Sequence, residues 1–234
     1  MATRARGTEG ETARRAMVGT ERSATEAATL RTMAGEGLHK VGEDGVRRAK
    51  KWLDATTRVR SSWTVYDDSA VTRLTFGWPN HSETFSYDLG GILYGGEFDH
   101  QSFLAESKKY SSDSGQGAHF DKFLAQSYVA LREDPRLSDN FMWITWAPFR
   151  VTTWSQISDP EKIVDALTRV DQYRSWVFGS VSPEDAEKLI DFDIVRELAS
   201  RMWMIVLSDR QERLVISDDD RSIVIQSRVK QGLV

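Results

Sequence analysis

Cysteine is absent from this chain of 234 residues, and so is any long apolar run. Without cysteine the protein has no disulfide, no zinc ribbon and no thiol nucleophile. No stretch approaches the length of a membrane-spanning helix, and the N-terminus lacks the apolar core of a signal peptide. We therefore expect a cytoplasmic protein that has no membrane partner.

The chain also has no net positive charge, since its formal net charge at pH 7 is −4. Proteins that hold nucleic acid without sequence preference neutralise its phosphates with many lysines and arginines. The charge balance therefore argues against a broad, non-specific grip on nucleic acid. A local basic face is still compatible with it.

Residues 1–40 contain no aromatic side chain and are rich in threonine, alanine, arginine, glutamate and glycine. This composition buries too little apolar surface to offset the entropy lost on ordering. We predict a disordered tail over this segment. The alternative is an arm that binds nucleic acid or a partner through Arg4, Arg6, Arg14 and Arg15.

The remaining chain has enough apolar residues for a sizeable core, and the sequence includes eight tryptophans. Helical periodicity marks residues 43–57 and 118–133. Strand candidates lie between and after these helices, at residues 62–68, 70–78, 84–94, 101–110 and 141–146. The order predicts an α/β protein with a mixed sheet flanked by helices.

The strands 84–94 and 101–110 predict a hairpin around a glycine-rich turn. If the turn is centred between them, Asp88 faces Glu106, with Cβ atoms about 4.5–5.5 Å apart. Side chains alternate along a strand, so Lys108 lies on the same face as Glu106. A slip of one residue would turn one partner away, so the prediction depends on the register.

Two carboxylates this close repel each other unless a cation lies between them. Mg²⁺ takes oxygen ligands of this kind and retains several waters, and a water made acidic by the metal attacks a phosphodiester. A lysine beside the metal orients that water or offsets charge on the phosphate. The alternative interpretation of Asp88, Glu106 and Lys108 is a solvent-facing strand edge with a cross-strand ion pair.

The pattern of an aspartate followed by a short hairpin and then Glu-x-Lys resembles the PD-(D/E)xK nuclease superfamily. The resemblance is strongest to its Mrr-like members. The resemblance covers residues 43–147 and rests on the segments YDLGGIL, FLAESKKY and FLAQSY. Tyr87 stands where the superfamily pattern has a proline before the aspartate. The resemblance implies a restriction-endonuclease-like fold and a DNA endonuclease that uses Mg²⁺ or Mn²⁺.

The resemblance also implies a role for each site residue. Asp88 and Glu106 would bind the metal, together with the main-chain carbonyl of Ser107. Lys108 would assist the attacking water, and Gln126 would lie close to the site. The implied setting is defence against foreign DNA, repair or maintenance of mobile elements.

Basic residues cluster on the polar face of the first predicted helix and directly after the Glu-x-Lys triplet. We predict that they bind DNA phosphates; the alternative is a solvated helix face. These residues are Arg47, Arg48, Lys50, Lys51 and Lys109. Glu43 matches, weakly, an acidic residue that the first helix of the resembled fold often supplies. Two glycine pairs, Gly90-Gly91 and Gly95-Gly96, are expected to let a strand bend and turn and to leave room for DNA.

We divide the chain into the tail, a nuclease-like core over residues 41–158 and a mainly helical C-terminal extension over residues 159–234 that packs on the core. Proline at the first helical position predicts helix starts at Pro160 and Pro183. Residues 202–207 fit either a buried strand or a helix. The extension is the candidate surface for a homodimer or a partner protein.

Two other functions fit the same residues. One is a non-catalytic module that keeps the nuclease fold and binds DNA or a protein, favoured by the acidic net charge. The other is a nuclease that cleaves RNA.

Overall fold

The computed structural model describes residues 42–55, 58–109 and 115–232. The predicted tail, residues 1–40, lies outside this range. Residues 42–55 are helical, as the apolar spacing predicts. Among the described residues, no helix is long and apolar enough to cross a membrane.

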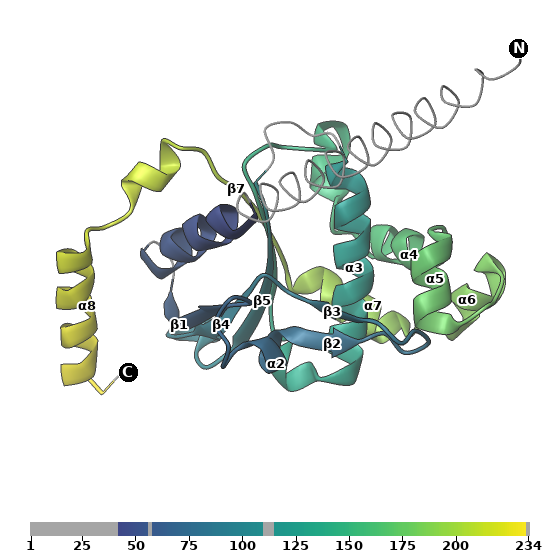
Figure 1. Ribbon diagram of the computed structural model, residues 1–234, viewed down its shortest axis with the longest axis horizontal. Helices are drawn as coiled ribbons and strands as arrows, with labels where there is room; N and C mark the ends of the chain where they lie inside the picture. Colours follow the sequence, from purple (N-terminus) through teal and green to yellow (C-terminus); the bar gives the residue numbers. More distant parts are fainter. Residues whose placement is uncertain (1–41, 56–57, 110–114, 233–234) are drawn as a thin grey trace, which may run out of the picture. The chain divides into compact units, whose positions relative to one another are not determined.

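After this first helix, strands come first and helices dominate the C-terminal third (Figure 1). The elements, in chain order, are β1 (Val59–Thr64), α2 (Val71–Leu74), β2 (Thr75–Gly77), β3 (Thr84–Ser86), β4 (Leu89–Leu93), η1 (Gly96–Phe98), β5 (Ser102–Lys108), α3 (Gln116–Glu133), η2 (Pro135–Leu137), β6 (Phe141–Thr145), η3 (Val151–Gln156), α4 (Pro160–Thr168), α5 (Asp171–Phe178), α6 (Pro183–Leu189), α7 (Phe192–Ser200), β7 (Met202–Val206), η4 (Gln211–Leu214) and α8 (Asp218–Lys230).

The main sheet has five strands in the order β1-β4-β5-β6-β7, and β2 pairs with β3 in a separate two-stranded sheet. β4 runs antiparallel to both of its neighbours, β1 and β5, whereas β5, β6 and β7 run parallel to one another. Parallel neighbours need a crossover connection, and α3 supplies it between β5 and β6. The predicted α/β class, with a mixed sheet flanked by helices, is confirmed.

Helices cover both faces of the sheet (Figure 1). On one face the helix over residues 42–55 packs Val46, Ala49 and Leu53 into a cluster with sheet residues such as Ile144. On the other face α3 packs against Trp143 and its neighbours, and α4, α5 and α7 extend that core. Every residue of β6 is buried because the strand is covered from both sides, as its apolar run predicts.

The central hairpin has the predicted register. Leu89 pairs with Ala105 in the antiparallel β4–β5 ladder, so one further step places Asp88 opposite Glu106. The predicted single strand over residues 84–94 is wrong, because Tyr87 and Asp88 lie in a break between β3 and β4. The strand breaks because β3 pairs with β2, and the Tyr87 N–H donates to the Leu74 carbonyl at 3.0 Å.

Gly90 and Gly91 do not leave room for DNA, which corrects the sequence-based expectation. Both are buried in β4, between β1 and β5. A Cβ added to Gly91 would lie 2.4 Å from the Ser61 carbonyl oxygen and 2.5 Å from the Phe103 ring. Glycine is needed here because neighbouring strands and side chains fill the space that a Cβ would take.

This packing gives a first prediction. Gly91→Ala should lower the free energy of unfolding by about 1–3 kcal/mol, since overpacking forces shifts in backbone and ring. Gly77→Ala is the matched control, because no described atom lies within 4 Å of a Cβ built there. Urea denaturation of both variants measures the effect. Equal stability of the two would show that the β1–β4–β5 packing adapts without cost.

In the C-terminal third, α4 starts at Pro160 and α6 at Pro183, as their proline positions predict. Residues 202–206 form β7, which settles the ambiguity between strand and helix. β7 pairs with β6, so the predicted C-terminal extension contributes the fifth strand of the main sheet. The boundaries of the predicted core and extension stay predictions.

Candidate active site

Asp88 lies where the chain passes from the small sheet into β4, and its side chain is fixed on the neighbouring strand. The Ser107 N–H donates to Asp88 Oδ2 at 2.9 Å. The Asp88 carbonyl accepts from the Val65 N–H at 3.0 Å. Tyr87 anchors the preceding position, since its ring is buried and its hydroxyl donates to Ser127 Oγ at 3.3 Å. The break in the strand therefore aims a carboxylate at the end of β5.

Glu106 and Lys108 project from the same face of β5, as the alternation of strand side chains predicts. Lys108 Nζ is 2.5 Å from Glu106 Oε1 and 3.7 Å from Asp88 Oδ2. The side chains of Asp88, Glu106 and Lys108 are 21%, 14% and 22% exposed, so all three lie mostly out of solvent. The lysine ammonium therefore supplies positive charge beside both carboxylates.

The electrostatic environment of Glu106 is unfavourable to its ionised form. Burial and then the negative charge of Asp88 raise the pKa of Glu106 to about 7, against the opposing effect of Lys108. Glu106 Oε2 is buried, and no described residue donates a hydrogen bond to it. A buried carboxylate oxygen of this kind favours the arrival of a cation or a proton.

These residues fit a hard divalent cation. Asp88 and Glu106 offer carboxylate oxygens side by side, and one of them, Glu106 Oε2, lacks a described partner. The described residues contain no cluster of three or more His, Cys, Asp or Glu placed to hold a metal. Mg²⁺ does not require one, because it retains waters and is held by one or two carboxylates. The Ser107 carbonyl as a further ligand stays a prediction.

α3 adds two residues to this site that the sequence analysis did not select. The positive charge of Lys122 helps to stabilise ionised Glu106. Burial, followed by the charges of Lys108 and Lys122, lowers the pKa of His119. Gln126 lies one helical turn beyond Lys122 and is only 4% exposed. Within the described residues no hydrogen bond joins Gln126 to a carboxylate of the hairpin, and its role stays a prediction.

The first helix approaches the site from the other face of the sheet. Gly45 makes this approach possible, because a Cβ there would lie 2.9 Å from Lys109 Cβ.

Tyr66 also borders the site, since burial and the negative charge of Asp88 raise its pKa. Glu43 forms an ion pair with Arg47 at 2.6 Å.

Four of the five predicted DNA-binding residues have carboxylate partners within the protein. Arg47 pairs with Glu43, Lys109 with Asp44, Lys50 with Asp54 at 2.7 Å, and Arg48 with Asp209 and Glu212. Lys51 is exposed. DNA binding by these residues stays a prediction, and it requires phosphates to replace carboxylates.

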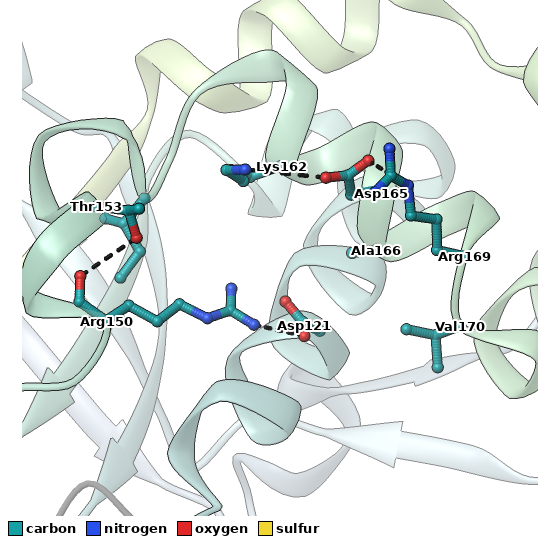
Figure 2. A pocket seen from close by; sticks show the side chains of 9 residues that line it. Asp121, Arg150, Thr153, Lys162, Asp165, Ala166, Arg169 and Val170 are labelled. Atoms are coloured by element: carbon teal, nitrogen blue, oxygen red, sulfur yellow. Dashed lines mark hydrogen bonds and ion pairs between the residues drawn. The ribbon is translucent and has the colours of Figure 1, made fainter.

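Another hollow, of about 320 Å³, lies apart from the predicted residues, between α3, η3 and α4 (Figure 2). Its cationic side chains are paired with carboxylates around its rim. Arg150 pairs with Asp121 at 2.6 Å, and Arg169 pairs with Asp165 at 2.9 Å. Charge is therefore balanced locally in this hollow.

The pKa of Glu106 gives a second prediction. Its folded value lies above the ordinary carboxylate value, so this group stabilises the fold below about pH 4.5 and that stability is lost as pH rises through 7. Without divalent metal, Glu106→Gln should therefore be about 1–3 kcal/mol more stable than wild type at pH 8 and nearly equal at pH 4.5. Chemical denaturation in EDTA at both pH values measures this difference. A variant no more stable than wild type at pH 8 would contradict a raised pKa of Glu106.

Comparisons of the chain with protein-family models, curated proteins and solved structures find no match. The geometry and charge of the hairpin are therefore the basis for inferring function.

Proposed function

We propose that this protein is a Mg²⁺-dependent endonuclease that hydrolyses phosphodiester bonds in DNA. One observation carries the proposal. The β4–β5 hairpin brings Asp88 and Glu106 together beside Lys108, with a buried carboxylate oxygen that lacks a partner among the described residues. A solvent-facing ion pair would not need a buried glutamate with a raised pKa.

The fold supports this proposal. The order of a helix, three antiparallel strands, a helix and a parallel strand agrees with the order predicted from the sequence. This order supports the proposal that the fold is restriction-endonuclease-like, as the PD-(D/E)xK resemblance implies. The segment from α2 to β3 is inserted between the first two strands of the main sheet and ends at Ser86, with Tyr87 between it and Asp88.

In the proposed mechanism Asp88 and Glu106 would hold a divalent ion through their carboxylate oxygens. When bound, the ion supplies Lewis-acid polarisation of the phosphate and makes water acidic enough to attack at neutral pH. The Ser107 N–H keeps Asp88 oriented, because it donates to the oxygen that also faces Lys108. Burial of the site strengthens these electrostatic interactions.

Lys108 has two roles in this arrangement. Without metal it offsets the repulsion between the two carboxylates. With substrate bound, its ammonium is placed to orient the attacking water and to stabilise negative charge that develops on the phosphate. Lys122, from α3, adds positive charge on the same side.

The alternative function is a binding module that keeps this fold without catalysis. The net charge of −4 and the internal pairing of the basic residues favour it. A cleavage assay separates the two functions. Purified protein is incubated with Mg²⁺, Mn²⁺ or EDTA and with supercoiled plasmid, linear duplex, single-stranded DNA and RNA.

We expect metal-dependent nicking or degradation of at least one DNA form and none in EDTA. Cleavage of RNA alone would assign the site to RNA. Binding without cleavage of any substrate would favour the binding module.

A further inference from the structure

The chain after β7, residues 208–232, is held to the rest of the molecule mainly by polar contacts. We name this segment the C-terminal arm; it contains η4 and α8. None of its described residues is buried, and Leu214 and Ile223 are 79% and 65% exposed. Segments with little buried apolar area detach at low free-energy cost. The arm is therefore positioned by charge more than by packing.

Arg48, on the first helix, binds two acidic residues of the arm. Its Nε donates to Glu212 Oε2 at 2.7 Å and its Nη2 contacts Glu212 Oε1, so the guanidinium holds the carboxylate with two nitrogens. Asp209 Oδ1 lies 2.5 Å from the same Nη2. Forked contact of this kind is how arginine binds both carboxylates and phosphates. Two acidic residues of the arm thus occupy an arginine whose geometry suits a phosphate.

The occupied arginine lies at the same end of the sheet as the candidate active site, on the face that the first helix covers. Arg48 is 4.0 Å from Asp44, which pairs with Lys109, the residue after Lys108. Its guanidinium also lies 5.3 Å from the ring centroid of Trp146. Trp146 follows β6 directly, where Thr145 is in register with Lys108. Arg48 and Lys108 therefore share the edge of the sheet where β5 and β6 end.

The arm also borders a hollow of about 440 Å³ beside the first helix. Arg47, Lys50 and Lys51 line it from the helix, and Arg221 lines it from the arm. Arg221 is 3.7 Å from Asp54, the partner of Lys50. Cationic side chains thus continue from Arg48 along the helix, and the arm lies against them.

We propose that the C-terminal arm is an intramolecular phosphate mimic that covers the nucleic-acid-binding face of the first helix. The phosphate backbone of the substrate displaces Asp209 and Glu212 from Arg48 and takes their place. The inference rests on the proposed function, because it names how substrate reaches that site. It explains why Arg48, which is predicted to bind DNA, is paired with two acids from the far end of the chain.

The test removes the two negative charges of the mimic and keeps side-chain size. Asp209→Asn/Glu212→Gln is compared with Glu184→Gln/Asp193→Asn, which changes the net charge equally on α6 and α7. Affinities for labelled duplex and single-stranded DNA are measured with Ca²⁺ in place of Mg²⁺, so that binding is separated from cleavage. The arm variant should bind DNA about tenfold more tightly than wild type. The affinity of the control variant should differ from that of wild type by less than about twofold.

The outcomes distinguish the two proposals. If wild type binds DNA and the arm variant binds no more tightly than the control, the mimic is overturned and the proposed function stands. If neither wild type nor the arm variant binds any nucleic acid, both the phosphate mimic and the proposed function are overturned. Adding Arg48→Ala to the arm variant should cancel most of its gain, because both effects act through one guanidinium.

A second measurement on the wild-type protein does not depend on how the variants fold. Amide hydrogen exchange across residues 211–230 should become faster when DNA is added, because the arm is released from the first helix. Unchanged or slower exchange in the arm at saturating DNA would overturn the proposal.

Discussion

Asp88→Asn and Glu106→Gln should each reduce the rate of metal-dependent cleavage by about 10³-fold or more, because each removes a negatively charged oxygen ligand worth several kcal/mol. Both variants should fold. The asparagine oxygen of Asp88→Asn can still accept from the Ser107 N–H, which positions residue 88 in the wild type. In Glu106→Gln a neutral group replaces a buried carboxylate that is costly to ionise.

Glu97→Gln is the matched control for these two variants. Glu97 lies in η1, on the turn of the same hairpin, and its side chain is exposed. The control should cleave at the wild-type rate. The assay is plasmid nicking under single-turnover conditions with Mg²⁺. If Asp88→Asn cleaves as fast as the control, the catalytic site lies elsewhere in the chain.

Lys108→Met should separate metal binding from chemistry. The ammonium competes with a metal for both carboxylates, so its removal should leave Mn²⁺ affinity unchanged or tighter. Cleavage should fall by about 10²–10³-fold, since the lysine acts on water and phosphate. Calorimetric titration with Mn²⁺, run beside the nicking assay, measures both quantities.

Lys109→Met is the informative comparison for Lys108→Met. Lys109 pairs with Asp44, and it is predicted to touch DNA and not the reacting phosphate. Its loss should raise KM and change kcat little. Loss of Mn²⁺ binding in Lys108→Met would contradict the assigned role, because the lysine would then be holding the carboxylates in place.

The hairpin register could be predicted from the sequence because it depends on local information. The turn fixes which residues pair, and the period of two fixes which face each side chain takes. The break before Asp88 could not be predicted in this way. It depends on the pairing of β3 with β2 and on the Tyr87 hydrogen bond to Leu74, whereas residues 84–94 have the local composition of one strand.

The residues that α3 adds to the site could have been predicted from the sequence. Helical spacing places His119 and Lys122 on the same side as Gln126, so a prediction for one of them extends to the others. The pairing of Arg48 with Glu212 had no such signal, because 164 residues separate the partners. A basic helix face looks solvated or available for DNA until the fold shows which carboxylates lie against it.

Whether the hairpin binds a divalent ion for phosphodiester hydrolysis is tested most directly by calorimetric titration of the protein–DNA complex with Ca²⁺, which replaces Mg²⁺ so that binding is separated from cleavage. Wild type and the double variant Asp88→Asn/Glu106→Gln are compared at pH 7.5. The predicted result is saturable binding by wild type and none by the double variant, with both proteins still bound to DNA. Equal binding by the two proteins, or no binding by wild type with DNA present, would contradict the assignment of Asp88 and Glu106 as metal ligands.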